Sequence, residues 1–323
     1  MIDRRISVAP MMDYTDRHCR YLLRLVSPGA LLYTEMVTAQ ALVHGDVERL
    51  LGFDGSEHPV ALQLGGCDPD LLARAARLGA ERGYDEINLN VGCPSDRVQS
   101  GSFGACLMAE PALVADCVRA MRGAVGVPVT VKCRIGIDDR DDYDFFGRFV
   151  ATVREAGVDT FIVHARKAYL RGLSPKENRE VPPLRYEVPL RLKHEHPGLT
   201  VILNGGIKSV AQVREWLPQF DGVMLGRQAY HEPYLLAELH QAFVDTGWPL
   251  PSREAIVEQY AEYVGRMLRE GHRLPLMLRH IHGLYTGFPG TRSWRRFLSE
   301  QGARMGAGAE VLRQSLRVFD RAA

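Results

Sequence analysis

Short apolar runs alternate with amphipathic stretches along the first 230 residues of the chain. Each run is rich in Val, Ile, Leu or Thr, is too short for a helix, and is followed by Gly, Pro or polar residues, the pattern of a buried strand. Eight such runs occur, at residues 6–11, 31–36, 60–65, 86–92, 129–135, 160–165, 200–204 and 222–225. Helical periodicity separates several of them, at residues 69–82, 111–122, 148–156 and 209–217. Eight strands that alternate with helices predict an α/β fold, a parallel (β/α)8 TIM barrel.

An open, doubly wound sheet is the alternative for this order of elements. Such sheets often carry a Gly-x-Gly-x-x-Gly sequence after the first strand. No such sequence follows residues 6–11, so the closed barrel is favoured.

From about residue 252 the pattern changes to helices alone. Ser252 fits a helix N-cap, and Glu254 follows in the first turn. Helical periodicity covers residues 253–270, 274–285, 293–304 and 309–321, with Gly and Pro turns between them. We therefore expect a barrel domain at residues 1–245 and a small all-helical C-terminal domain at residues 246–323.

The composition is that of an ordinary globular protein. The chain has 323 residues, 46% hydrophobic and 24% charged, with a net charge of +1, as in ordinary globular proteins. It has no apolar run of about 18 residues, the length of a membrane span, and no apolar signal-peptide core at its start. We therefore expect a cytoplasmic protein that needs no membrane, and no obligate protein partner is evident.

Six cysteines occur, and none forms a Cys-x-x-Cys pair. No spacing of Cys and His suggests a zinc site, so no metal is expected. Without a secretion signal, a chain of this size is expected to keep its thiols reduced, most of them as structural residues.

The functional site of a TIM barrel lies at the carboxyl ends of its strands. Candidate ligand-contacting residues follow the predicted strands at this end: Pro10, Met11 and Met12; Glu35; Gln63; Asn90 and Cys93; Lys132 and Arg134; His164 and Arg166; Asn204, Gly205 and Gly206; Gly226 and Arg227. Polar groups scattered by chance would not recur so regularly at one end of each strand.

The glycines after the last two predicted strands indicate a phosphate site. Gly205-Gly206 and Gly226-Arg227 are turns that leave backbone N–H groups free ahead of helices, and Arg227 adds a charge-assisted donor. Ordinary turns that need Gly for positive φ are the alternative.

Lys132, His164 and Gln63 supply donors that suit the carbonyls, ring nitrogens and hydroxyls of a flavin whose phosphate lies at these turns. A lysine in an otherwise apolar strand is costly unless it is paired or faces a ligand. A buried pair between Lys132 and Glu35 is the structural alternative.

Cys93 lies just past the predicted strand at 86–92, in a Gly-Cys-Pro turn that cannot continue the strand. A thiol in this place is held on rigid backbone and faces the mouth of the barrel. The alternative is a small buried apolar residue, the commonest fate of a free cysteine.

Two further segments bear on function, and each has a functional and a structural interpretation. Residues 167–197 form an unusually long connection beside the mouth, and such connections are either functional or disordered. Residues 244–323 carry 12 Arg and no Lys against 8 acidic residues, which indicates a polyanionic partner or, alternatively, a solvated helical surface.

These motifs together resemble the tRNA-dihydrouridine synthases along the whole chain. The matching segments are Ala9-Pro10-Met11, Asn88-Leu89-Asn90-Val91-Gly92-Cys93-Pro94, Val131-Lys132-Cys133-Arg134-Ile135-Gly136, Val163-His164-Ala165-Arg166, Asn204-Gly205-Gly206-Ile207 and Gly226-Arg227. Residues 174–180 and 290–300 are similar to the A subfamily, which acts on uridines 20 and 20a. Cys133 stands where the family often has Thr, and strand alternation predicts that it points away from Lys132 and packs in the core.

The resemblance implies an FMN enzyme that reduces the C5–C6 double bond of uridine in tRNA, with NADPH as reductant. It implies that hydride reaches C6 of uracil, that Cys93 gives the proton to C5, and that Asn90 and Arg134 contact the substrate. Residues implied to bind FMN are Pro10, Met11, Met12, Gln63, Lys132, His164, Asn204, Gly205, Gly206, Gly226 and Arg227. Residues implied to orient tRNA are Lys176, Arg179, Arg292 and Arg295.

Three other functions are also compatible with the sequence. The nearest is a flavin-dependent dehydrogenase or reductase of a free pyrimidine base, which would not need a basic helical domain. The others are a non-catalytic RNA-binding protein on a barrel scaffold and a phosphate-handling isomerase without flavin.

Overall fold

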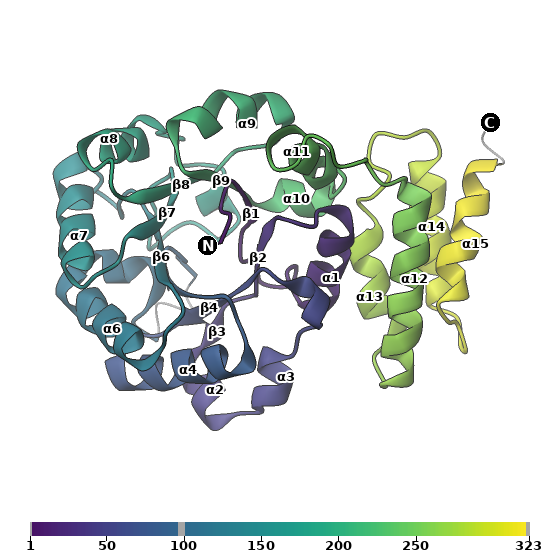
Figure 1. Cartoon of the computed structure of the whole chain (residues 1–323), viewed down its shortest axis with the longest axis horizontal. Helices are drawn as coiled ribbons and strands as arrows, with labels where there is room; N and C mark the ends of the chain where they lie inside the picture. Colours follow the sequence, from purple (N-terminus) through teal and green to yellow (C-terminus); the bar gives the residue numbers. More distant parts are fainter. Residues whose placement is uncertain (1, 96–100, 321–323) are drawn as a thin grey trace.

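Eight parallel strands close a barrel in the computed structural model, which describes residues 2–95 and 101–320. The strands are β1 (Ile6–Val8), β2 (Leu31–Tyr33), β4 (Val60–Gly65), β5 (Glu86–Val91), β6 (Val129–Arg134), β7 (Thr160–His164), β8 (Thr200–Asn204) and β9 (Gly222–Leu225). Consecutive strands pair in parallel, β9 pairs with β1, and β2 pairs with β4 to close the ring. The predicted TIM barrel is confirmed (Figure 1).

A ninth strand, β3 (Val37–Thr38), pairs with the carboxyl end of β4, whose amino end pairs with β2. Two residues are too few to show alternation, so the sequence gives no signal for this strand. The first two predicted strands are too long at their carboxyl ends, because the chain leaves the sheet after Val8 and Tyr33 to build the mouth.

Helices surround the barrel (Figure 1). They are α1 (Arg17–Val26), α2 (Ala39–His44), α3 (Val47–Leu51), α4 (Pro69–Arg82), α6 (Pro111–Ala124), α7 (Tyr143–Glu155), α8 (Glu187–Glu195), α9 (Val210–Trp216), α10 (Arg227–His231) and α11 (Leu235–Phe243), with short 3-10 helices η1 (Gly55–Glu57), η2 (Gly104–Ala109), η3 (Glu177–Arg179) and η4 (Leu217–Gln219). The helix α4 has its predicted bounds, because Asp68 caps its first turn and Gly83, at φ +100°, ends it. The predicted start of α7 at residue 148 is wrong: the Asp142 carboxylate accepts from the Phe145 N–H (2.8 Å) and starts the helix five residues earlier.

Side-chain alternation along the strands separates the barrel interior from the core beneath the helices. The interior holds an apolar cluster made of Ala9, Leu31, Tyr33, Ala61, Ile162, Ile202 and Met224. Cys133 belongs to the other core, between the sheet and the helices, which confirms the prediction that it packs away from Lys132. Burial raises the pKa of its thiol to about 12, so it stays protonated.

In the described part of the chain, four helices follow the barrel, as predicted. They are α12 (Arg253–Arg269), α13 (Leu274–Ile281), α14 (Thr291–Gly302) and α15 (Glu310–Asp320). The Ser252 hydroxyl caps α12 by accepting from the Ala255 N–H (3.1 Å). The predicted end of α13 at residue 285 is wrong, and the predicted last residue of α15, Arg321, lies outside the described residues. The expected domain boundary falls between α11 and α12 and stays a prediction.

Asp16 joins this helical region to the barrel. One oxygen of its carboxylate accepts from the N–H groups of His18 and Cys19 and caps α1 (both 3.0 Å). The other accepts from Arg279 (2.7 Å) and lies 3.0 Å from His280 Nε2, both on α13. Burial acts to raise the pKa of Asp16, but the His280 and Arg279 contacts outweigh it and hold that pKa well below its usual range. A charged Asp16 therefore fixes α13 against the first barrel helix.

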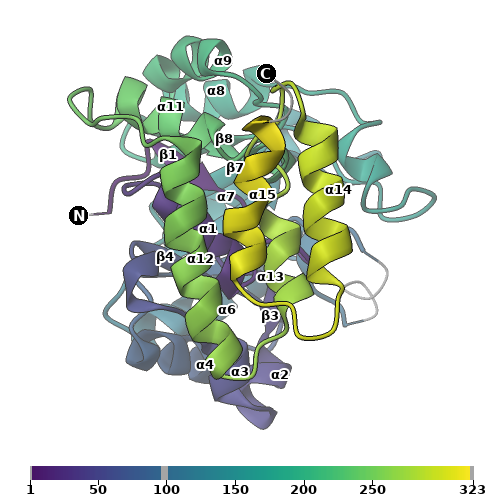
Figure 2. The same cartoon turned by 90° about the vertical axis from the view of Figure 1, so that its right-hand side faces the viewer.

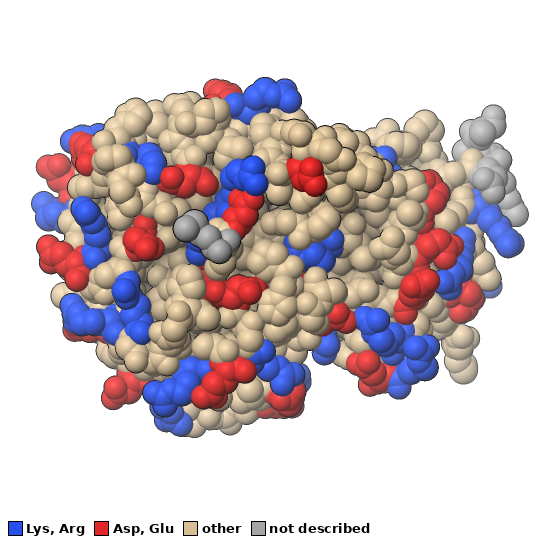
Figure 3. Space-filling model, in the orientation of Figure 1, with Lys and Arg blue, Asp and Glu red and all other residues tan. Residues whose placement is uncertain are grey.

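The face from which the chain enters β1 carries no patch of one charge. In Figure 3, Lys and Arg are interleaved with Asp and Glu over both the barrel and the helical region. A polyanion therefore has no evident docking surface on this face.

Among the described residues, no helix is both long and apolar enough to cross a bilayer.

Candidate active site

The predicted site residues meet at the carboxyl ends of the strands. They lie on five neighbouring strands: Gln63 on β4, Asn90 on β5, Lys132 on β6, His164 on β7 and Asn204 on β8. The strand register pairs Asn90 with Lys132 and His164 with Asn204. These side chains therefore line one mouth, as the sequence predicts.

Cys93 lies in the turn that follows β5. Its N–H donates to Asn90 Oδ1 (3.0 Å), as does the N–H of Gly92 (3.1 Å), and its C=O accepts from the Ala105 N–H (2.9 Å). The residue is half-buried, and its Sγ lies 3.5 Å from Ser95 Oγ. The backbone on both sides of the thiol is thus fixed, while the residue stays partly exposed.

Lys132 and His164 differ in charge at neutral pH: the lysine is mostly charged and the histidine is neutral. Burial, with the charge of Arg134 as the next cause, lowers the pKa of Lys132 to about 8, so most of it remains an ammonium at pH 7. Its Nζ donates to Asn204 Oδ1 (3.0 Å). Burial and the charges of Arg134 and Lys132 lower the pKa of His164 far enough to keep its imidazole neutral. The ammonium on β6 therefore lies beside a neutral ring on the neighbouring strand β7.

The alternative pairing of Lys132 with Glu35 is not found among the ion pairs of the described residues. Glu35 instead accepts from the Asp13 N–H (2.5 Å), and Asp13 has φ +67°. Burial and the negative charge of Asp16 raise the pKa of Glu35. This carboxylate shapes the loop after β1.

That loop contains Pro10, Met11 and Met12. Met11 is half-buried and packs against the apolar interior of the barrel, whereas Met12 is 53% exposed. The Met11 C=O accepts from the N–H of Thr15 (3.0 Å), which turns the chain toward α1. The loop thus presents an apolar edge to the mouth.

Arg134 is nearly fully buried and holds backbone together. Its guanidinium donates to the C=O groups of Gly92 (3.1 Å), Lys167 (3.0 Å) and Asn178 (2.9 Å). Burial lowers its pKa to about 10, so it stays charged at neutral pH. In this structure Arg134 therefore ties the cysteine turn to the long loop after β7.

Gly205 and Gly206, after β8, adopt positive φ of +116° and +73°. A Cβ on Gly205 would lie 2.7 Å from His164 Cδ2, and one on Gly206 would lie 2.5 Å from Leu184 Cδ1. Both turn conformation and close packing therefore require glycine here.

The next turn completes a cradle of donors. Within the described residues, the N–H groups of Gly206, Gly226 and Arg227 have no intramolecular acceptor. The Arg227 guanidinium donates to Glu180 Oε1 (2.6 Å), so this position already attracts an anionic group. Unpaired N–H groups beside an arginine are the chemistry that binds phosphate.

Comparison with known proteins decides the family. The family model described as Dihydrouridine synthase (Dus) matches residues 7–320. The chain belongs to the dihydrouridine synthase family.

Similar family members include proteins named tRNA-dihydrouridine(20/20a) synthase. One from Xanthomonas campestris is 59% identical over 316 residues, covering 98% of this chain and 94% of the relative. One from Shewanella oneidensis is 55% identical, covering 97% and 93%. One from Pseudomonas syringae is 58% identical, covering 92% and 89%. The predicted family resemblance is confirmed.

Among solved structures, a 2-naphthoyl-CoA reductase in complex with 2-naphthoyl-CoA resembles this chain with a TM-score of 0.54 and 11% identity. The likeness covers 74% of this chain and 50% of that one. At this identity it supports the fold alone.

The residues expected to orient tRNA in this dihydrouridine synthase lie on two separate elements. Lys176 and Arg179 belong to the loop after β7, and Arg292 and Arg295 to α14; all four are exposed. Figure 2 shows α14 and that loop on the same side of the molecule. The Arg295 guanidinium also donates to the His282 C=O (2.7 Å) and to Thr286 Oγ1 (2.8 Å), so it has a structural role too.

Sequence reasoning missed Asn178, which organises the long loop. Its side chain is buried, accepts from the Tyr169 N–H (2.8 Å) and donates to the C=O groups of Tyr169 (3.0 Å) and Leu173 (3.1 Å). A single Asn within the charged stretch 174–180 gives no sequence signal of burial. The segment is thus held by defined contacts, which favours the functional reading of its length.

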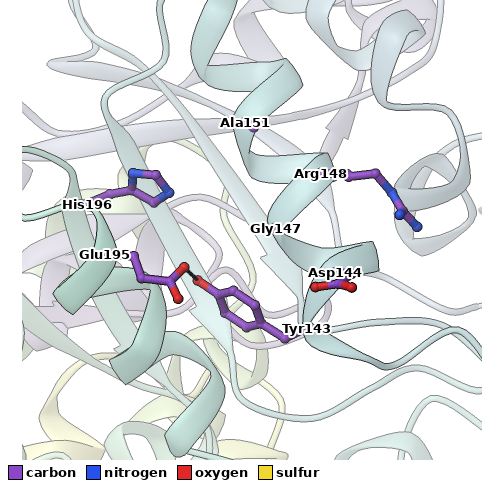
Figure 4. Close-up of a pocket in the computed structure, with 7 residues that line it drawn as sticks. All are labelled: Tyr143, Asp144, Gly147, Arg148, Ala151, Glu195 and His196. Atoms are coloured by element: carbon purple, nitrogen blue, oxygen red, sulfur yellow. Dashed lines mark hydrogen bonds between the residues drawn. The ribbon is translucent and has the colours of Figure 1, made fainter.

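A hollow of about 340 Å³ lies elsewhere, between α7 and α8 on the outer surface (Figure 4). The Tyr143 hydroxyl donates to Glu195 Oε2 across it (2.6 Å). None of the predicted site residues lines it. It is therefore a surface feature and not the active site.

Proposed function

We propose that this chain reduces uridine in tRNA to 5,6-dihydrouridine, at positions 20 and 20a, with FMN as bound cofactor and NADPH as reductant. The observation that carries the proposal is the Cys93 thiol in the same mouth as Lys132, His164 and Asn204. Curated relatives that share 55–59% identity along nearly the whole chain are named for this activity and these positions.

The residues present fit FMN. The free N–H groups of Gly206, Gly226 and Arg227 would hold the phosphate, and Arg227 would exchange Glu180 for it. The ammonium of Lys132 and the donors of Gln63 and Asn204 would contact the polar edge of the ring. Pro10, Met11 and Met12 offer apolar contact, and Gly205 lets the backbone approach closely. Bound FMN would supply the hydride that uracil C6 receives.

The protein's own contribution to the chemistry is the proton. Thiols are competent general acids when they lie within hydrogen-bond reach of the accepting atom. Cys93, fixed by its backbone contacts and partly exposed, would donate to C5. Asn90 keeps one amide N–H that is free to hold a carbonyl edge of uracil.

The substrate uridine must leave its stack to reach the mouth, which costs a few kcal/mol. Contacts to RNA phosphates offset this cost and supply most of the affinity. These phosphate contacts would come from four basic side chains: Lys176, Arg179, Arg292 and Arg295. Arg134 would act on the substrate through the cysteine turn and the loop that it ties together.

Reconstituted with FMN, the protein is expected to absorb visible light, to bleach with NADPH, and to regain colour when unmodified tRNA is added. Recovery should be accompanied by one or two dihydrouridines in the tRNA, measured by mass spectrometry. Free uridine should not restore the colour. Equal recovery with free uridine would instead favour a reductase of small pyrimidines.

Arg292→Ala is expected to weaken tRNA binding and to reduce the slope of log K against log salt by about one, the value for one lost phosphate contact. Arg292 is exposed, and no hydrogen bond of its side chain is recorded among the described residues, so the fold should not change. A fluorescence titration over a range of salt concentrations measures this slope. The matched control is Arg119→Ala, an exposed arginine on α6. An unchanged slope in Arg292→Ala would remove this residue from the tRNA surface.

A further inference from the structure

A continuous chain of hydrogen bonds runs from the amino end of β5 to the cysteine turn. At its start the fully buried carboxylate of Glu86 pairs with Arg4 and accepts from Thr130 Oγ1 (2.7 Å) and from the Tyr33 hydroxyl (2.6 Å). Thr130 Oγ1 in turn accepts from Asn88 Nδ2 (2.8 Å). These contacts occupy the part of the barrel farthest from the mouth.

The chain continues through two amides. Asn88 Oδ1 accepts from Gln63 Nε2 (2.8 Å), and Gln63 Oε1 accepts from Asn90 Nδ2 (2.9 Å). Asn90 Oδ1 then accepts from the N–H groups of Gly92 and Cys93. Glu86 and Asn90 are four residues apart on one strand, so the chain spans about 13 Å.

The direction of every bond in this chain is fixed by its two ends. A backbone N–H can only donate, and a carboxylate paired with an arginine can only accept. Asn90 must therefore present its oxygen to the turn, and each amide behind it must keep the same orientation. Gln63 and Asn90 then each keep one N–H for a ligand.

Stability alone does not account for these polar groups. The barrel interior also holds an apolar cluster that includes Leu31, Ile162, Ile202 and Met224, so apolar residues can fill this space. Buried polar groups cost free energy unless every partner is satisfied, and a network that is satisfied rigidifies its surroundings. The links from Glu86 to Asn90 lie on β4, β5 and β6, directly below the cysteine turn.

We infer that Glu86, Thr130 and Asn88 are positioning residues, which act through Gln63 and Asn90 to hold the Cys93 turn in place. They do not reach the mouth themselves. The inference rests on the proposed role of Cys93 as proton donor. It predicts that a break in the chain far below the mouth changes the behaviour of this one thiol.

Thr130→Val tests the inference, because it keeps the shape of the side chain and removes only the hydroxyl link. In FMN-free protein, alkylation of Cys93 by iodoacetamide, followed on its peptide by mass spectrometry, should become about three- to tenfold faster as the turn loosens. In the reconstituted enzyme kcat for tRNA should fall about tenfold, the effect of one lost buried hydrogen bond, with KM unchanged.

Thr130→Ser restores the hydroxyl and should return both values to within about twofold of the wild type. Thr160→Val is the matched control: a buried threonine on β7 whose hydroxyl donates to Asp159 and lies outside the chain. It should leave both measurements unchanged.

Wild-type alkylation and kcat in a folded Thr130→Val protein would overturn the inference. Should that variant fail to fold, Asn88→Leu breaks the chain one link nearer the mouth and must give the same two changes. If Cys93→Ala proved fully active, the proton-donor role would fail, but alkylation of Cys93 would still report whether the chain holds the turn.

Discussion

Cys93→Ala is expected to lose about 10²- to 10⁴-fold in the rate of uridine reduction, the usual contribution of a positioned general acid. The methyl group cannot donate a proton to C5. The variant should still bind tRNA, and NADPH should still bleach its flavin, because the backbone bonds from Gly92 and residue 93 to Asn90 do not involve the thiol. Single-turnover recovery of flavin colour on adding tRNA measures the loss.

The control for this variant is Cys106→Ala. Cys106 is also half-buried and lies in η2, but its thiol donates to the Phe103 C=O (3.1 Å). Its replacement should leave the rate within about twofold of the wild type. A Cys93→Ala enzyme that recovered colour as fast as Cys106→Ala would show that another group supplies the proton.

Lys132→Met is expected to have two opposite effects at pH 7. It should weaken FMN binding about 10- to 100-fold, since a hydrogen bond from a charged donor contributes roughly 1.5–3 kcal/mol. It should also stabilise the FMN-free protein, because the fold no longer has to bury an ammonium. Flavin fluorescence measures the first effect, and urea unfolding measures the second.

The size of the stabilisation follows from the pKa of Lys132. A decrease from the ordinary 10.5 to about 8 corresponds to roughly 3 kcal/mol. Partial exposure of the side chain and the lost hydrogen bond to Asn204 reduce the expected gain to about 1–2 kcal/mol.

This gain should depend on pH. Folded protein releases the Lys132 proton near pH 8 and unfolded protein near pH 10.5, so between these values the unfolded state binds more protons. The wild-type free energy of unfolding therefore rises with pH in this window relative to the variant. The advantage of Lys132→Met should be complete below pH 8 and gone by about pH 10.5.

Lys208→Met is the matched control, since Lys208 is exposed in the loop after β8. Its difference from the wild type should not change between pH 7 and 10. A constant advantage of Lys132→Met over the same range would mean that the buried charge does not limit stability.

Local chemistry explains why so much of the fold could be predicted. Alternation and run length place all eight barrel strands, and α4 has its predicted bounds because its caps, Asp68 and Gly83, are adjacent in sequence to its ends. The predicted start of α7 is wrong, although its cap, Asp142, is also adjacent in sequence to the first residue of the helix. The strand β3 could not be predicted, because its two residues pair only after β4 is in place.

The candidate site also has features that the sequence predicts and features that only the structure shows. Strand ends in a parallel barrel face one mouth, so the sequence alone could bring Gln63, Asn90, Lys132, His164 and Asn204 together. It could not show that the Arg134 guanidinium is used by three backbone carbonyls, or that Arg227 contacts Glu180. Those contacts join segments far apart in sequence.

By itself, the sequence determined the barrel, the helical region behind it, the family, and the cysteine at the end of β5. These depend on periodicity, capping and motifs, which are local properties of the chain. Only the tertiary structure decided what surrounds that cysteine: Asn90 behind its backbone, a polar chain down to Glu86, and a buried Arg134 that joins its turn to the loop after β7. Hydrogen-bond direction and burial arise from distant segments brought into contact, so no local pattern encodes them.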